Sequence, residues 1–458
     1  MVIQTLDQTL DFIHGLTWAG VPPAVQHVAA RCVLDLSATL IAGRATDLSR
    51  IVRDVTAAAY GGNEATLLLD GRRVSAPGAA LANGMTIDAM DMHDGYRLAK
   101  GHAGVNVFPA ALAMGEVVGW RGEDFGTALV VGYEVALRAG VALHHTAGDY
   151  HTSGAWGALG AAAVTARALG LDAAQTRHAL GIAEYHGPRS LMMRCIDHPT
   201  MLKDGSGWGS MSGVLAGRLA AAGFTGAPAL TAEGDDVLSG WANLGQAWLM
   251  RDLYFKPYAC CRWAQPAVEG ACALAAEHRL ASTDIAEIVV HTFEAATRLT
   301  VTRPANTEQA QYSLPYPVAA ALVDGRLDPE QMTAPRIFSK AILCLADRVT
   351  MTVDEALEAR FPAEALARVT LYSVDGQCFE SGICGARGDS TDPLSDTDLT
   401  VKFNRMAKGH LATDRVDALR KACWDCAMLD DVRQLVVLLG PPPDGHGPAR
   451  VKRNYWRK

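Results

Sequence analysis

The spacing of apolar residues changes near residue 282, and this change most constrains the fold. Before it the chain has helical spacing almost throughout. One such segment follows Pro22 and Pro23 and ends at Gly43, and its apolar positions are Val25, Val28, Cys32, Leu36 and Leu40. Beyond it, β-branched or alternating runs at 288–293, 349–353 and 369–374 predict strands. From Ser395 the helical pattern returns, with Ser395 and Asp398 as a predicted cap.

These patterns predict a mainly α protein with a smaller α+β part. We expect a helical domain over 1–274, an inserted α+β domain over 275–395, and a helical segment over 396–458 that rejoins the first domain. Small residues dominate 153–166, which lets helix backbones approach closely. Two further motifs predict helix starts: a capping box at 172–175, and a cap at 328–331 with proline at the first helical position.

Composition excludes several classes of protein. Hydrophobic residues make up 49% and charged residues 20% of the 458 residues, below the roughly 25% charge of typical soluble domains. This excludes disorder and requires a large core or a subunit interface. The net charge is −8 with no basic run, so we expect no nucleic-acid partner.

We expect a cytoplasmic protein without a membrane span. The N-terminus lacks the pattern of a signal peptide, and charges at Glu134, Arg138 and Arg167 interrupt the most apolar stretches. The ten cysteines have no disulfide-like spacing and are expected to be reduced. Cys423 and Cys426 form a CxxC without a second pair, which favours a core-facing helical pair over a metal site.

Carboxylates and histidines are dense between residues 88 and 104, around Asp91, His93 and His102. Three interpretations are open: a metal site with these three ligands, a solvated helix end, and an acid–base site where a carboxylate orients a histidine. No zinc spacing template fits. We favour acid–base chemistry, because histidine titrates near neutral pH.

Two further segments place a basic side chain beside a helix start. His151 precedes the small-residue helix, where amide dipoles favour anions. Lys203 precedes the glycines of 205–213, but no GK[ST] completes a phosphate loop. We expect a lysine and exposed amides that suit a carboxylate.

The segment 254–265 contains Lys256 and Arg262 among apolar neighbours, so both are either surface cations or anion anchors. Cys261 has no local histidine partner that would make it a nucleophile. Tyr316 opens an apolar helix, a position that is more typical of packing than of catalysis.

Taken in order, these segments resemble the MmgE/PrpD family, which includes 2-methylcitrate dehydratase, cis-aconitate decarboxylase and iminodisuccinate epimerase. The resemblance spans almost the whole chain. It is carried by residues 84–94, GHAGVNVFPAALA at 101–113, YHTSGAWGALGAAA at 150–163, GVLAGRLAAAGFTG at 213–226, KPYACCRWAQPA at 256–267 and YSLPYPVAAALVDG at 312–325.

The resemblance implies a helical domain built from both chain ends, an inserted α+β domain, an active site in the cleft, and a homodimer. It implies small di- or tricarboxylate substrates and neither metal nor organic cofactor. By position, several residues match family motif or active-site positions: Asp91, His102, His151, Lys203, Lys256 and Tyr316. Cys261 falls where some members have a histidine.

The chain also departs from the family pattern. Gly95 stands where the aspartate-rich motif has threonine, so a hydroxyl is missing, and His93 is an added histidine. Gln265 replaces a later histidine. These changes fall among the positions that the resemblance places in the active site, so we expect them to affect which substrate is bound.

We therefore expect a cofactor-independent lyase, either a dehydratase or a decarboxylase, that acts next to a carboxylate. His151 and His102 are the candidate base and acid, Asp91 orients a histidine, and Tyr316 donates a proton. Lys203 is the fifth catalytic candidate, which neutralises charge on a carboxylate, and the candidate substrate-binding groups are Lys256, Arg262, Cys261, His93 and Gln265. The alternatives are an epimerase or isomerase of a small dicarboxylate and a non-catalytic dimeric polycarboxylate-binding protein. An iron–sulfur dehydratase would need three converging cysteines, which the sequence does not indicate.

Overall fold

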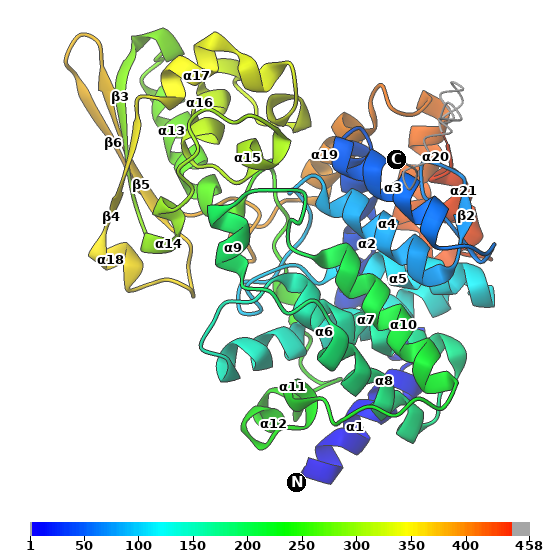
Figure 1. The fold of residues 1–458 in the computed structure, drawn as a ribbon. Coiled ribbons are helices and arrows are strands. Elements are labelled where there is room, and N and C mark those ends of the chain that lie inside the picture. The colour runs from blue at the N-terminus through cyan, green and yellow to red at the C-terminus, as the bar shows by residue number, and fades with distance from the viewer. Residues whose placement is uncertain (1, 442–458) are drawn as a thin grey trace, which may run out of the picture.

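The computed structural model describes residues 2–441 and has two parts (Figure 1). The larger part is helical, and the smaller part contains a four-stranded sheet. The helices of the first half of the chain are α1 (Val2–Gly15), α2 (Pro23–Gly43), α3 (Asp47–Ala59), α4 (Ala76–Asp88), α5 (Gly104–Val118), α6 (Gly122–Thr146), α7 (Ser153–Leu169), α8 (Ala173–His186), α9 (Met192–Asp197), α10 (Ser206–Ala221), α11 (Leu230–Glu233) and α12 (Leu238–Trp241). A short antiparallel pair, β1 (Ala65–Thr66) and β2 (Arg73–Val74), lies between α3 and α4.

Helix α7 is at the centre of the helical part and packs against α5, α6 and α10. Its small residues allow this, as the sequence predicts. A Cβ on Gly160 of α7 would lie 2.4 Å from the carbonyl oxygen of Gly132 on α6. A Cβ on Gly213 of α10 would lie 2.4 Å from the carbonyl oxygen of Ala158 on α7. Larger residues at either position would push these helices apart.

The C-terminal helices α19 (Asp396–Ala407), α20 (Thr413–Trp424) and α21 (Arg433–Leu438) return to the helical part (Figure 1). Helix α19 packs against α2, and the buried Lys402 Nζ lies 2.6 Å from Asp35 Oδ1. The predicted cap is present, because Ser395 accepts a hydrogen bond from the Asp398 amide. The predicted segment beyond residue 441 lies outside the described residues.

The sheet has the order β4-β3-β5-β6. Strand β3 (Ile285–Thr292) pairs in parallel with β4 (Val349–Val353) and antiparallel with β5 (Ala367–Ser373). Strand β6 (Cys378–Cys384) pairs antiparallel with β5. The three predicted strands are confirmed, and β6 was not predicted because its exposed edge position gives it a weak apolar alternation.

Helix α13 (Gln265–Glu277) packs against β5 and β6, and the other helices of this part are α14 (Glu294–Thr297), α15 (Thr307–Gln311), α16 (Pro315–Asp324), α17 (Lys340–Ala346) and α18 (Glu355–Glu358). The predicted cap at Asp328 begins a single 3-10 turn, Pro329–Met332, rather than a longer helix.

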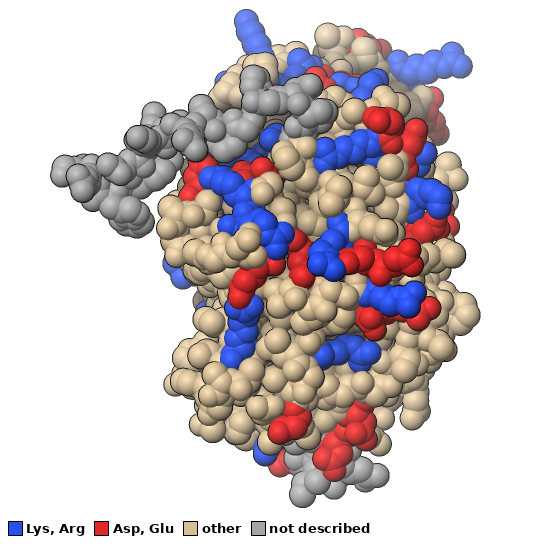
Figure 2. All heavy atoms as spheres, turned by 90° about the vertical axis from the view of Figure 1, so that its right-hand side faces the viewer, with Lys and Arg blue, Asp and Glu red and all other residues tan. Residues whose placement is uncertain are grey.

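Helix α2 ends at Gly43, and Asp172 and Gln175 form the predicted capping box, so both predictions are confirmed. Helices α2 and α6 are long and apolar enough to cross a membrane, but most of each is buried inside the protein, as in a core helix. Cys423 and Cys426 are buried in the core, as the sequence predicts. On the face in Figure 2, acidic and basic side chains are interleaved between wide uncharged areas.

Candidate active site

A cleft lies where the loop after α4 meets residues of the sheet-bearing part. Its lining combines charged or titratable side chains with aromatic rings. The first group is Asp91, Arg97, Lys100, His102, Lys256, Cys261, Arg262 and Asp389. The second is Tyr96, Tyr150, Tyr254, Trp263, Tyr312 and Phe361. Segments far apart in the sequence therefore supply one cationic, aromatic-walled site.

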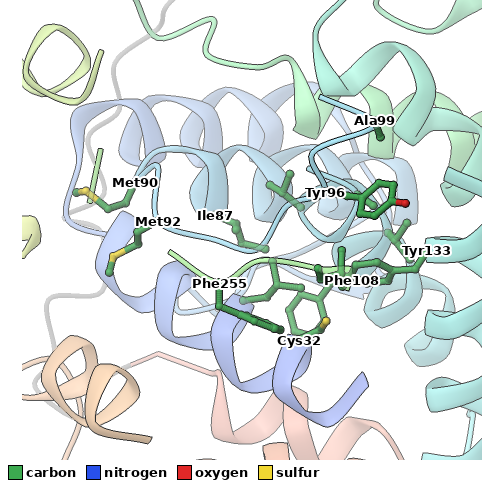
Figure 3. Packing of buried hydrophobic residues seen from close by; sticks show 14 of the residues in the cluster. Cys32, Ile87, Met90, Met92, Tyr96, Ala99, Phe108, Tyr133 and Phe255 are labelled. Carbon is green, nitrogen blue, oxygen red and sulfur yellow. The ribbon is translucent and has the colours of Figure 1, made fainter. Parts of the chain in front are cut away.

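Asp91 and Lys256 form a buried ion pair at this cleft. The backbone at Asp91 is held in place by the residues on either side of it. Met90 and Met92 are both fully buried in the apolar cluster that includes Ile87 (Figure 3). Burial by itself would raise the pKa of the Asp91 carboxyl, but the ammonium of Lys256, and then that of Lys203, lowers it further than burial raises it. Asp91 is therefore ionised at neutral pH and holds the Lys256 ammonium in place.

His102 is set up as a neutral base. Its Nδ1 lies 2.7 Å from the carbonyl oxygen of Asp94, and a carbonyl only accepts hydrogen bonds. Nδ1 therefore carries the proton, and Nε2 is left with its lone pair. Burial, and then the positive charge of Lys256, lowers the pKa of His102 well below 6.5.

His93 lies behind His102 and does not line the cleft. The two rings are edge-to-face, with centroids 4.5 Å apart, and His93 is fully buried. Its Nε2 is 3.7 Å from Asp88 Oδ1, too far for a hydrogen bond. The structure gives His93 the position of a support for the His102 ring rather than of a substrate-binding group.

The amides of two helix starts are satisfied by acidic residues of the chain itself. The Ser206 amide at the start of α10 donates to Asp88 Oδ2 at 3.4 Å, and Ser206 and Gly207 are buried. The Ser153 amide at the start of α7 donates to Asp204 Oδ1 at 3.0 Å. The prediction of exposed amides after Lys203 is wrong, because close helix packing covers them.

Lys203 is buried and does not line the cleft. Its Nζ donates to Gln311 Oε1 at 2.8 Å and lies 4.6 Å from the centroid of the Tyr312 ring. Gln311 Oε1 also accepts a 2.8 Å hydrogen bond from the Asp91 amide. Lys203 therefore reaches the site through Gln311 and through its charge at Asp91.

Arg262 lines the cleft, but its guanidinium is already hydrogen-bonded to other residues of the protein. It donates to Gln265 Oε1 at 2.9 Å, to the carbonyl oxygens of Ala386 and Arg387 at 3.0 Å, and to Asp389 Oδ2 at 3.2 Å. Gln265 thus positions Arg262 and is not part of the lining. Burial raises the pKa of the Cys261 thiol to about 12, so this cleft residue is uncharged at neutral pH.

His151 and Tyr316 lie outside the lining of the cleft. His151 Nδ1 is 2.9 Å from the carbonyl oxygen of Asp149, and its amide is 3.1 Å from His144 Nε2. The Tyr316 hydroxyl donates to the carbonyl oxygen of Gln331 at 2.6 Å. The structure thus brings Asp91, His102 and Lys256 together, and does not bring these two side chains to them.

The site also contains residues that the sequence analysis did not select. Tyr254 and Lys100 lie in segments that were selected for other residues, Lys256 and His102, whereas Gln311 and Asp389 come from segments without a recognisable catalytic spacing. The one available signal is Gln311, a polar side chain directly before the apolar run that starts at 312. Among residues 2–441, no group of three or more His, Cys, Asp or Glu side chains is arranged to hold a metal ion.

Comparison with known proteins agrees with this architecture. The model of the MmgE/PrpD N-terminal domain matches residues 7–244, and that of the C-terminal domain matches residues 258–426. A cis-aconitate decarboxylase-like protein of Aspergillus oryzae is 23% identical over 418 residues, which cover 80% of this chain and 83% of the relative. A cis-aconitate decarboxylase of Aspergillus terreus is 23% identical over 421 residues, covering 81% and 83%. Because the two matches together span most of the chain, this protein belongs to the MmgE/PrpD family.

Proposed function

We propose that this protein is a cofactor-independent lyase that removes carbon dioxide or water from a small polycarboxylate, with cis-aconitate as the first candidate substrate. The names of the two fungal relatives support the substrate class. The observation that carries the proposal is the neutral His102 beside the Asp91–Lys256 pair in a cation-lined cleft.

The geometry suits chemistry next to a carboxylate. An unprotonated His102 Nε2 can take a proton from a carbon atom adjacent to a carboxylate, and the electron pair left there delocalises into that carboxylate. Elimination is complete when the pair forms a C=C bond and hydroxide leaves, to be protonated to water. In decarboxylation the pair comes from the C–C bond as carbon dioxide leaves, and the carbon then takes a proton from water, whose hydroxide is left to combine with the carbon dioxide as bicarbonate. Lys256 stabilises the negative charge in both cases.

Among residues 2–441, one cation of the cleft has no acidic partner. Lys256 is paired with Asp91, and Arg97 and Arg262 both face Asp389, at 3.5 and 3.2 Å. Lys100 forms no ion pair with any residue that the structure describes, and its Nζ lies 5.7 Å from the centroid of the Tyr150 ring. We propose that Lys100 binds the substrate carboxylate that lies farther from Lys256.

Mass spectrometry in D2O with a panel of cis-aconitate, citrate and C4–C5 dicarboxylates tests the proposal. A net loss of about 43 mass units, which is 44 for carbon dioxide less one for the deuteron taken up at carbon, indicates decarboxylation, and a loss of about 18 indicates dehydration. Deuterium uptake without mass loss would establish an isomerase instead, and binding without turnover a binding protein. The His102→Gln variant should lose about 10² to 10⁴ in rate; unchanged turnover would remove His102 from the mechanism.

We also propose that the protein is a homodimer. Helix α10 and its flanks expose large apolar side chains, namely Leu202, Trp208, Leu215 and Phe224. Exposed apolar patches of this kind mark association surfaces. Light scattering should give twice the chain mass for the wild type, and the Leu215→Glu variant should shift the equilibrium towards a monomer. A monomeric wild type at micromolar concentration would contradict this.

A further inference from the structure

The Tyr254 side chain lies in the cleft beside His102, and its backbone is fixed. The Gly95 amide donates to the carbonyl oxygen of Tyr254 at 3.0 Å, and the Tyr254 amide donates back at 2.9 Å. The ring is held on one side by the guanidinium of Arg262, whose Cζ is 4.6 Å from the ring centroid. Its centroid is 6.1 Å from that of the His102 ring.

Gly95 leaves the space that the end of this ring occupies. A Cβ at position 95 would lie 2.3 Å from the Tyr254 hydroxyl oxygen and 2.4 Å from Cζ. It would also lie 2.8 Å from His102 Nδ1. Gly95 does not have a positive φ, so the backbone conformation does not require glycine there. Glycine is needed at position 95 because a side chain there would collide with the Tyr254 hydroxyl.

The hydroxyl of Tyr254 has no hydrogen-bond partner among the described residues, although the residue is only 4% exposed. By comparison, the hydroxyl of the buried Tyr133 donates to Asp94, and that of the half-buried Tyr150 donates to the carbonyl of Lys100. The hydroxyl oxygen is not among the fully buried unpaired polar atoms of the described residues, and Tyr254 lines the cleft, so the hydroxyl is accessible to a ligand there. Burial raises the pKa of Tyr254 well above 10, so the phenol keeps its proton at neutral pH.

We infer that the Tyr254 hydroxyl is a catalytic hydrogen-bond donor, which binds the substrate next to His102 and stabilises the negative charge that develops there. The inference rests on the proposed function. It adds Tyr254 to the site, a residue that is not among those matched to MmgE/PrpD motif positions in the sequence. In this chain Tyr254 fills the space in which a side chain at position 95 would stand, and a hydroxyl is thereby restored to the site.

Steady-state kinetics of Tyr254→Phe with the active substrate of the panel tests this inference. We expect kcat to fall about 10²-fold, as for the loss of one oxyanion donor, with KM changed by less than about threefold. Thermal stability should not fall, because the hydroxyl that is removed has no hydrogen-bond partner in the part of the chain that the structure describes. Tyr185→Phe, on an exposed tyrosine, is the matched control and should behave as the wild type.

A Tyr254→Phe variant with a kcat within about threefold of wild type would overturn the inference and leave the proposed lyase standing. A kcat loss accompanied by an equal loss in the control would also overturn it. A wild-type protein that neither binds nor converts any member of the panel would overturn the proposed function itself, and the role of Tyr254 with it.

Discussion

The side chains of Lys203 and Gln311 meet inside the protein, with Lys203 Nζ 2.8 Å from Gln311 Oε1. Gln311 closes helix α15 of the sheet-bearing part, whereas Lys203 precedes α10 of the helical part. The same oxygen accepts a hydrogen bond from the amide of Asp91. The Gln311 side chain thus fixes Lys203 and Asp91 relative to each other across the two parts of the protein.

Replacing Gln311 by leucine should destabilise the fold. The buried Lys203 ammonium and the Asp91 amide would both lose their acceptor, which we expect to cost about 3 kcal/mol. Chemical denaturation measures this loss. Gln309→Leu is the control on the same helix, where one peripheral hydrogen bond to Ala305 is lost and about 1 kcal/mol is expected. Equal losses in the two variants would contradict the bridging role of Gln311.

In variants of the Asp91–Lys256 pair, we expect stability to be recoverable without recovery of activity. Asp91→Asn or Lys256→Met alone leaves one buried charge without its partner, so each should lose about 3–5 kcal/mol in the free energy of unfolding. The double variant removes both charges and should regain most of that stability. Its turnover should stay lost, because the cation at the reacting carbon is gone. A double variant as unstable as the sum of the single variants would show that the pair is not coupled.

Lys100 should control affinity for the larger substrates. Lys100→Met should raise the KM of a tricarboxylate about tenfold, equivalent to about 1.4 kcal/mol, and change that of a dicarboxylate less. Lys100→Arg should retain tricarboxylate affinity. Lys421→Met, on an exposed lysine of α20 that pairs with Asp425, is the control. An equal KM change for both substrate classes would contradict the assignment.

Stability should fall as the pH rises through neutrality. Burial, and then the charge of Asp35, raises the pKa of Asp94 to about 8 from 3.8. Between these two values the folded state binds more protons than the unfolded state, so raising the pH favours unfolding. Burial also raises the pKa of Glu134 to about 7, which acts in the same direction. Urea denaturation between pH 5 and 8 should give a weaker pH dependence for Asp94→Asn than for the wild type. If the free energy of unfolding of Asp94→Asn depended on pH as steeply as that of the wild type, a group other than Asp94 would be responsible for the pH dependence.

Much of the fold follows from local patterns. The strands at 285–292, 349–353 and 367–373 alternate or carry β-branched residues, and the caps at Asp172 and Ser395 have their partners three residues away. Such signals act within one turn or one strand. Strand β6 depends instead on pairing with β5 and leaves only a weak pattern in its own residues.

The candidate site was predictable where a residue's chemistry is unusual in its segment. Asp91, His102 and Lys256 were selected in this way and meet at the cleft. Gln311 and Tyr254 were not, because their importance depends on contacts with residues far along the chain. The prediction of exposed amides at the start of α10 was wrong for the same reason, since tertiary packing places Asp88 against the Ser206 amide. At the start of α7, packing likewise places Asp204 against the Ser153 amide.

The role inferred for the Tyr254 hydroxyl leads to a final prediction, which concerns position 95. Gly95→Ala puts a methyl group 2.3 Å from the Tyr254 hydroxyl oxygen, so the ring must move or the backbone pairing must open. Such overpacking costs about 1–3 kcal/mol, which thermal or chemical denaturation will measure. Because the displaced ring carries the proposed donor, kcat should fall to near that of Tyr254→Phe. The Gly95→Ala/Tyr254→Phe double variant should then show little further loss in kcat, since both changes remove the same hydroxyl from the substrate. Multiplicative losses would mean that Gly95 acts on the reaction through His102 Nδ1, 2.8 Å from the added methyl group, and not through Tyr254.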